Sequence, residues 1–70
     1  MIWDADDLEL FERPVLLRDV AIVTGISPSL WALRIVKAES DGLVFSPRAA
    51  PWWTLTERGR EMLRDARARA

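Results

Sequence analysis

The sequence predicts a mainly α-helical domain with one small β-hairpin, in the order helix, strand, helix, helix, strand, strand, helix. Half of the 70 residues are hydrophobic, which is enough for one apolar core, and a chain of this length forms a single domain over residues 1–70. Proline and glycine divide the chain into four helical stretches. Two short runs rich in aromatic and β-branched residues lie before the last stretch and predict the hairpin.

The first helix is expected over about residues 4–12. Asp4 can cap its N-terminus, and Leu8 and Phe11 fall on one face, which we expect to point inward. The helix should end before Pro14, because the residue that precedes a proline disfavours the α conformation. A short extended link then leads from this proline to the next helix.

Two further helices, over about residues 17–24 and 28–41, are separated by a short turn. Gly25 favours an end to the first of them, because glycine adopts the left-handed conformation at little cost. Ser27 can cap the second helix, and Pro28 suits its first position, where a missing N–H costs nothing. This is a helix-turn-helix arrangement, whose second helix can lie in the major groove of DNA.

A β-hairpin and a last helix complete the predicted domain. The hairpin strands are residues 43–46 and 52–55, because both runs are rich in β-branched and aromatic side chains. The proline-bounded segment between them forms the hairpin tip, and Thr56 can cap the helix that follows. The expected boundaries are about 17–41 for the helix-turn-helix, 43–55 for the hairpin and 57–69 for the C-terminal helix.

The tryptophans indicate which faces form the core. Trp31 and Ile35 fall on one side of the third helix, and we expect both to point inward. Trp53 is also expected in the core, whereas Trp52 alternates with it along the strand and should face outward. Trp3 precedes the first helix and can staple it to the core.

Three segments of the chain carry a resemblance to a known family. They are Gly25-Ile26-Ser27-Pro28-Ser29, Glu39-Ser40-Asp41-Gly42-Leu43-Val44 and Leu55-Thr56-Glu57-Arg58-Gly59-Arg60-Glu61-Met62-Leu63. Together they resemble the motifs of the winged helix-turn-helix family of DNA-binding transcriptional regulators, over about residues 7–66. The opening Trp3-Asp4-Ala5-Asp6-Asp7 is similar to small phage-repressor-like or haloarchaeal members. The resemblance implies a sequence-specific, repressor-like regulator of transcription.

The charges are distributed unevenly along the chain. The net charge is −1, but residues 1–33 contain six acidic and two basic side chains, whereas residues 34–70 contain eight basic and five acidic ones. This asymmetry is typical of a protein with an anionic partner at one end. All the basic residues except Lys37 are arginines, which suit bidentate contacts to phosphates and bases, although a GC-rich genome produces the same bias.

The composition excludes several classes of site. The chain contains no cysteine and no histidine, so zinc sites built from these residues, thiol nucleophiles and histidine-dependent triads are excluded. The carboxylates between Asp4 and Glu9 lack the spacing of a calcium loop. We therefore expect no enzyme, cofactor, metal or small-molecule ligand. No apolar run approaches the roughly 20 residues of a membrane span and the start is not basic, so a cytoplasmic protein is expected.

The resemblance implies which residues contact DNA. In the family, the exposed face of the third helix contacts base edges in the major groove, and the hairpin, called the wing, contacts the backbone or the minor groove. On this chain the expected DNA-contacting residues are Ser27, Ser29, Leu33, Arg34, Val36 and Lys37 in the third helix or its cap, Arg48 at the wing tip and Arg18 in the second helix. Leu33 and Val36 depart from the polar residues that the family usually has there.

Three explanations of these apolar positions remain open. Leu33 and Val36 can pack on thymine methyl groups in the major groove. Alternatively, they belong to a protein-binding surface, so that the domain acts as an anti-repressor or adaptor. That surface would consist of Ile22, Val23, Leu33, Val36 and Trp52. Coverage of some of them by the first helix or the wing is a third explanation.

A homodimer is also expected, because a single DNA-binding module occupies a small site. The candidate dimer surfaces are the outward aliphatic side chains and the last helix, with Met62, Leu63 and Ala66.

Overall fold

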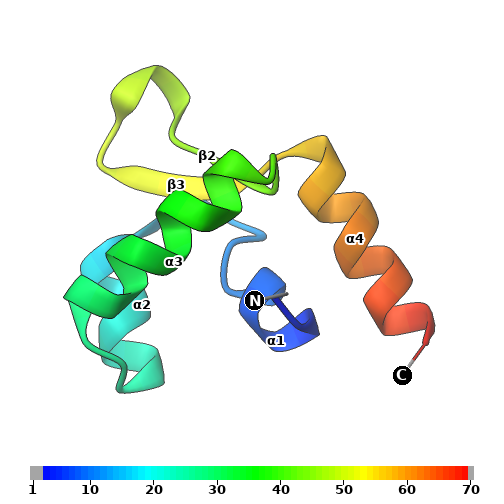
Figure 1. Cartoon of the computed structure of the whole chain (residues 1–70), viewed down its shortest axis with the longest axis horizontal. Helices are drawn as coiled ribbons and strands as arrows, with labels where there is room; N and C mark the ends of the chain where they lie inside the picture. Colours follow the sequence, from blue (N-terminus) through cyan, green and yellow to red (C-terminus); the bar gives the residue numbers. More distant parts are fainter. Residues whose placement is uncertain (1–2, 70) are drawn as a thin grey trace.

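The computed structural model describes residues 3–69 and places one small antiparallel sheet among four helices (Figure 1). The elements are α1 (Ala5–Glu9), β1 (Val15–Leu16), α2 (Leu17–Thr24), α3 (Pro28–Ser40), β2 (Val44–Phe45), a single 3-10 turn (Pro47–Ala49), β3 (Trp52–Leu55) and α4 (Glu57–Ala68). The mainly helical class and the predicted order of helices and strands are confirmed.

The first helix is shorter than predicted. Asp4 caps α1 as expected, in a reciprocal pair with Asp7: Asp4 Oδ1 accepts from the Asp7 backbone N–H at 2.9 Å, and Asp7 Oδ2 accepts from that of Asp4 at 3.4 Å. The α-helix ends at Glu9 because the carbonyl of Phe11 turns toward the sheet. That carbonyl accepts the backbone N–H of Leu55 at 2.9 Å and the hydroxyl of a neighbouring threonine in β3. A pairing across the fold thus overrides the local helical pattern.

A three-residue turn joins α2 to α3, and the two helix axes meet at 117°. Gly25 ends α2 in the left-handed conformation at φ 71°, and Ser27 caps α3 by accepting the Leu30 backbone N–H at 3.2 Å. The hydroxyl of Thr24 fixes the corner, since it accepts the indole N–H of Trp31 at 2.8 Å and donates to a carbonyl in α2. The predicted bounds of α2 are confirmed, and α3 ends one residue early, at Ser40.

The sheet has the order β1-β3-β2, with β3 paired antiparallel on both sides. The extended link expected after Pro14 is an edge strand, in which Val15 pairs with Trp53. At the hairpin tip, Arg48 and Ala49 adopt φ values of 52° and 56°. The predicted first strand therefore pairs with the hairpin and connects it to the start of α2.

Aromatic side chains form the centre of the core. Trp31 is fully buried, and its ring lies 5.8 Å from that of Trp3 and 5.9 Å from that of Phe11, measured between centroids. The expected inward positions of Trp31 and Ile35 and the stapling role of Trp3 are confirmed. Trp53 is half-buried against the core, and Trp52 faces outward as expected.

Helix α4 lies directly on the backbone that enters the hairpin. Thr56 caps α4, because its hydroxyl accepts the backbone N–H of Gly59 at 3.0 Å. A Cβ atom at Gly59 would overlap the carbonyl oxygen of Leu43 and lie 3.0 Å from the side chain of Leu55. Glycine is therefore required here by close packing.

Within residues 3–69, no single helix is long and apolar enough to cross a membrane, although α2 and α3 together have the length and composition of a bent pair.

We predict that Gly59→Ala lowers the free energy of unfolding by about 3 kcal/mol, because α4 must move away from the Leu43 backbone. Urea unfolding followed by circular dichroism measures the change. The matched control is Arg60→Ala, at an exposed neighbouring position, with an expected change of less than about 0.5 kcal/mol. Equal stabilities of Gly59→Ala and the parent chain would contradict this account of the packing.

Candidate interaction surface

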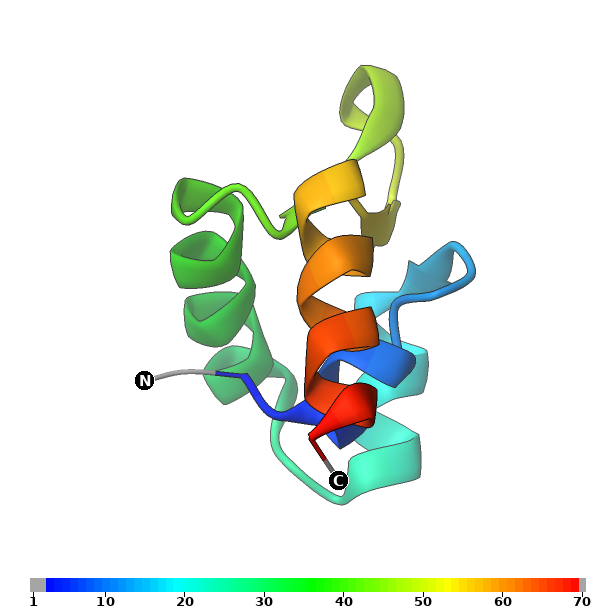
Figure 2. The ribbon, with the colours of Figure 1, turned by 90° about the vertical axis from the view of Figure 1, so that its right-hand side faces the viewer.

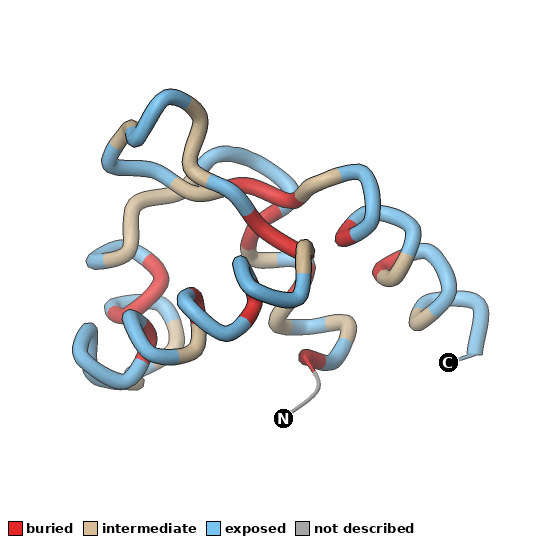
Figure 3. The backbone as a smooth tube through the Cα atoms, turned by 45° about the horizontal axis from the view of Figure 1, so that its top comes forward, coloured by how far each residue is buried: buried red, intermediate tan, exposed pale blue. Residues whose placement is uncertain are grey.

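Large apolar side chains are exposed on the outer sides of α2 and α3, and this set of residues is here called the α2–α3 face. It consists of Ile22, Val23, Leu30, Leu33 and Val36. Exposure is 76% for Ile22 and 70% for Leu33. Figure 3 shows that buried residues alternate with longer exposed stretches along both helices. The explanation that α1 or the hairpin covers these side chains is therefore wrong within the described residues.

The structure corrects the expected position of Arg34. Its side chain is only 13% exposed, and Nη2 lies 3.1 Å from Oδ2 of Asp7 in α1. Its guanidinium also lies 4.3 Å from the centre of the Trp31 ring, a distance typical of a cation–π contact. Arg34 thus points to the inner side of α3 and does not belong to the α2–α3 face. Its long side chain reaches a partner 27 residues earlier, which helical periodicity alone does not reveal.

The Asp7–Arg34 pair is held under strong desolvation. Burial raises the pKa of Asp7 above its ordinary value of 3.8, while the hydrogen bond from the Asp4 backbone and the charge of Arg34 act in the opposite direction. The Nε atom of Arg34 is buried and has no hydrogen-bond partner among the described residues. The pair therefore joins α1 to α3 at a considerable cost in hydration.

The raised pKa of Asp7 predicts a pH dependence of stability. The folded chain binds the Asp7 proton more tightly than the unfolded chain, so the contribution of Asp7 to stability decreases as pH rises through the folded-state pKa. Urea unfolding of the parent chain and of the Asp7→Asn variant, followed between about pH 3 and 7, tests this prediction. The stability of the parent relative to the variant should fall over this range. Asp6→Asn, at an exposed neighbouring position, is the control. A relative stability that rises with pH would contradict this sign.

The other basic candidates lie around the α2–α3 face. Lys37 is exposed, and its Nζ lies 3.5 Å from Oδ1 of Asp41 at the end of α3. Arg18 near the start of α2 is exposed, with Nε 3.8 Å from Asp19. Arg48 is exposed at the hairpin tip. Exposed ion pairs of this kind contribute little to stability, so these cations are free to exchange partners.

The remaining candidates are distributed over both ends of α3 and the hairpin. Ser27 and Ser29 are exposed at the N-terminus of α3, although the hydroxyl of Ser27 already caps the helix. Trp52 is partly exposed on β3, on the sheet rather than on either helix of the α2–α3 face. Leu33 and Val36 are thus exposed on α3 and Ile22 and Val23 on α2, whereas Trp52 lies on the sheet.

The structure does not support the last helix as a dimer surface. Leu63 is 3% exposed, and Met62 packs against the core of the same chain. Arg67 connects α4 to the N-terminal segment through two ion pairs. Its Nη2 atom lies 2.8 Å from Oε1 of Glu9 and 2.7 Å from Oε1 of Glu12. These hydrogen bonds raise the pKa of Arg67. The inner side of α4 is therefore used within the monomer (Figure 2).

No protein-family model, curated protein or solved structure matches this chain.

Proposed function

We propose that this chain is a winged helix-turn-helix domain that binds double-stranded DNA. The observation that carries the proposal is the exposed outer side of α3, held at 117° to α2 by a three-residue turn. Helix-turn-helix units place two helices at about 90–120° and insert the second into the major groove. The hairpin beside α3 corresponds to the wing.

Helix α3 is suited to enter the groove by its N-terminal end. Its 13 residues span about 20 Å, and Ser29 and Leu30 are exposed on its first turn. Leu33 and Val36 lie further along the same side, where aliphatic groups can contact thymine methyl groups. The proposed base contacts are therefore mainly apolar, with Ser29 as the polar contributor.

Phosphate contacts are available on both sides of this helix. Among residues 3–69, no side chain caps the N-terminus of α2, so its backbone N–H groups can face a phosphate, and Arg18 lies in the first turn of this helix. Arg48 lies at the wing tip, and Lys37 can exchange Asp41 for a phosphate. Three side-chain cations thus flank α3 in place of the four expected from the sequence, because Arg34 is used inside the fold.

The proposal predicts moderate, salt-dependent DNA binding. Three neutralised phosphates correspond to a slope of log affinity against log salt concentration of about −2.7 per protomer. Fluorescence anisotropy with a pool of DNA duplexes of random sequence measures this slope. Arg48→Gln should reduce it by about 0.9 and lower the affinity. Arg64→Gln, at an exposed position on α4, is the control and should change neither quantity. Absence of retained DNA at low salt would refute the proposal.

A second candidate function is favoured by the aliphatic character of the α2–α3 face. Five large apolar side chains are exposed on these two neighbouring helices, and exposed apolar patches often mark protein-binding surfaces. The charges at its edge are balanced, since Arg18 lies beside Asp19 and Lys37 beside Asp41. A balanced edge suits a two-fold contact, in which each charge meets its opposite on a second copy. The alternative is therefore a self-associating interaction domain, of the adaptor or anti-repressor type.

Self-association predicts a dimer in sedimentation velocity that Leu33→Glu converts to a monomer. A carboxylate on the α2–α3 face should weaken the dimer at least a hundredfold, because the interface would then bury a negative charge that has no positive partner. Glu39→Gln, at an exposed position on the same helix, is the control. A monomeric parent chain at the highest concentration reached would contradict this candidate. Arg48→Gln separates the two functions, since it should weaken DNA binding and leave the dimer unchanged.

A further inference from the structure

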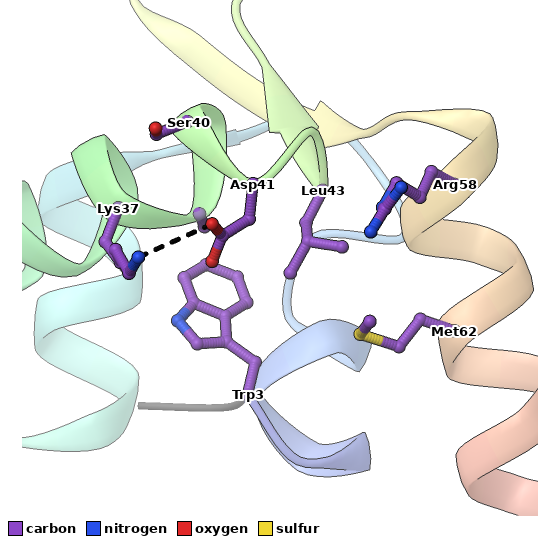
Figure 4. Close-up of a pocket in the computed structure, with 8 residues that line it drawn as sticks. Trp3, Lys37, Ser40, Asp41, Leu43, Arg58 and Met62 are labelled. Atoms are coloured by element: carbon purple, nitrogen blue, oxygen red, sulfur yellow. Dashed lines mark hydrogen bonds and ion pairs between the residues drawn. The ribbon is translucent and has the colours of Figure 1, made fainter.

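A pocket of about 420 Å³ lies between the C-terminal half of α3, the turn before β2 and the N-terminal half of α4 (Figure 4). Its volume falls within the range of small-molecule sites in proteins, about 300–1,000 Å³. It lies apart from the exposed side chains of the α2–α3 face, and Lys37 alone belongs to both groups of candidate residues.

Apolar and polar side chains line the pocket in about equal measure. The indole of Trp3 projects between α3 and α4, with Leu43 and Met62 beside it (Figure 4). Trp3 and Leu43 are almost completely buried, so their positions are fixed by the core. They form the floor of the pocket, and an apolar group would contact only their exposed edges and the half-buried thioether of Met62.

Two cations face each other across the opening. Lys37 extends from α3, and Arg58 extends from α4 toward the same space (Figure 4). Lys37 already has Asp41 as a partner, at 3.5 Å. Arg58 has no ion-pair partner within 4.0 Å among residues 3–69. Its side chain lies over the turn at Gly42, where its Cδ would be 3.5 Å from a Cβ atom.

We propose that this pocket binds a small organic acid with one carboxylate and a flat apolar body. The guanidinium of Arg58 can bind the carboxylate through two parallel hydrogen bonds, with Lys37 as a second positive charge. The apolar body would then lie against Trp3 and Met62. With two cations and Asp41 at its edge, the pocket favours a monoanion over a dianion.

The sequence alone predicts no small-molecule ligand, and this pocket cannot be recognised from it for a physical reason. The lining side chains come from three segments that are far apart along the chain, around residues 3, 37–43 and 58–62. None of these segments contains a ligand-binding motif. Their meeting depends on the approach of α4 to Leu43, which the absence of a side chain at Gly59 permits.

One consequence rests on the proposed DNA binding. Lys37 is available either to a phosphate of DNA or to the carboxylate in the pocket. An acid in the pocket should therefore weaken DNA binding, and DNA should weaken binding of the acid by the same factor.

The direct test uses 2-naphthoate as the probe and nuclear magnetic resonance of the ¹⁵N-labelled chain, without DNA. The indole N–H signal of Trp3, assigned with Trp3→Phe, should shift in a saturable manner. The expected Kd is on the order of 1 mM, from about 0.3 kcal/mol per non-hydrogen atom. Arg58→Gln should raise the Kd about tenfold, a loss of about 1.4 kcal/mol. Arg60→Gln, at an exposed position two residues further along α4, should leave the Kd unchanged.

Several results would overturn the site. They are the absence of a saturable shift, equal binding of the uncharged 2-naphthamide, and equal weakening by Arg58→Gln and Arg60→Gln. The DNA assay is separate: a saturable shift at Trp3 supports the site even if the chain binds no DNA. If DNA binds but 2-naphthoate leaves its affinity unchanged, the coupling through Lys37 is refuted.

Discussion

The indole of Trp31 is the contact on which the rest of the structure depends. Its N–H is bound by the hydroxyl of Thr24, which holds the corner between α2 and α3. Its ring packs against Trp3 and Phe11, so the N-terminal segment is anchored to the same point. Since Arg34 also lies over this ring, one buried side chain sets the positions of α1, α2 and α3. The angle that exposes the outer side of α3 is therefore a consequence of core packing.

The same packing determines the charge of the candidate interface. Asp7 and the Trp31 ring bind Arg34 on the inner side of α3, so this cation is used inside the fold and not on the outer side of the helix. The outer side retains Leu33 and Val36 at its centre. A nucleic-acid interface there would depend on flanking cations and apolar base contacts, and a protein interface would depend on the aliphatic groups themselves. Lys37 connects this surface to the pocket beside α4, because it lies at the edge of both.

Local signals in the sequence predicted most of the fold. Asp4, Ser27 and Thr56 each cap a helix, and Gly25 ends α2, because all four act on backbone groups within a few residues. Alternation along the strand placed Trp52 outside. The exposed positions of the α2–α3 face also follow from helical periodicity. Part of the candidate interaction surface was thus predictable, namely its exposed aliphatic side chains and the exposed cations at the hairpin tip and in α2.

The sequence by itself determined where the helices begin, which faces are apolar and which functional classes lack the necessary residues. The tertiary structure alone decided the early end of α1, the pairing of β1 with β3, the inward position of Arg34 and the pocket at Trp3. Each of these depends on groups separated by more than 20 residues, such as the Phe11 carbonyl and β3 or Asp7 and Arg34. Capping and periodicity operate over one or two helical turns, whereas such pairs form only when the core brings distant segments together.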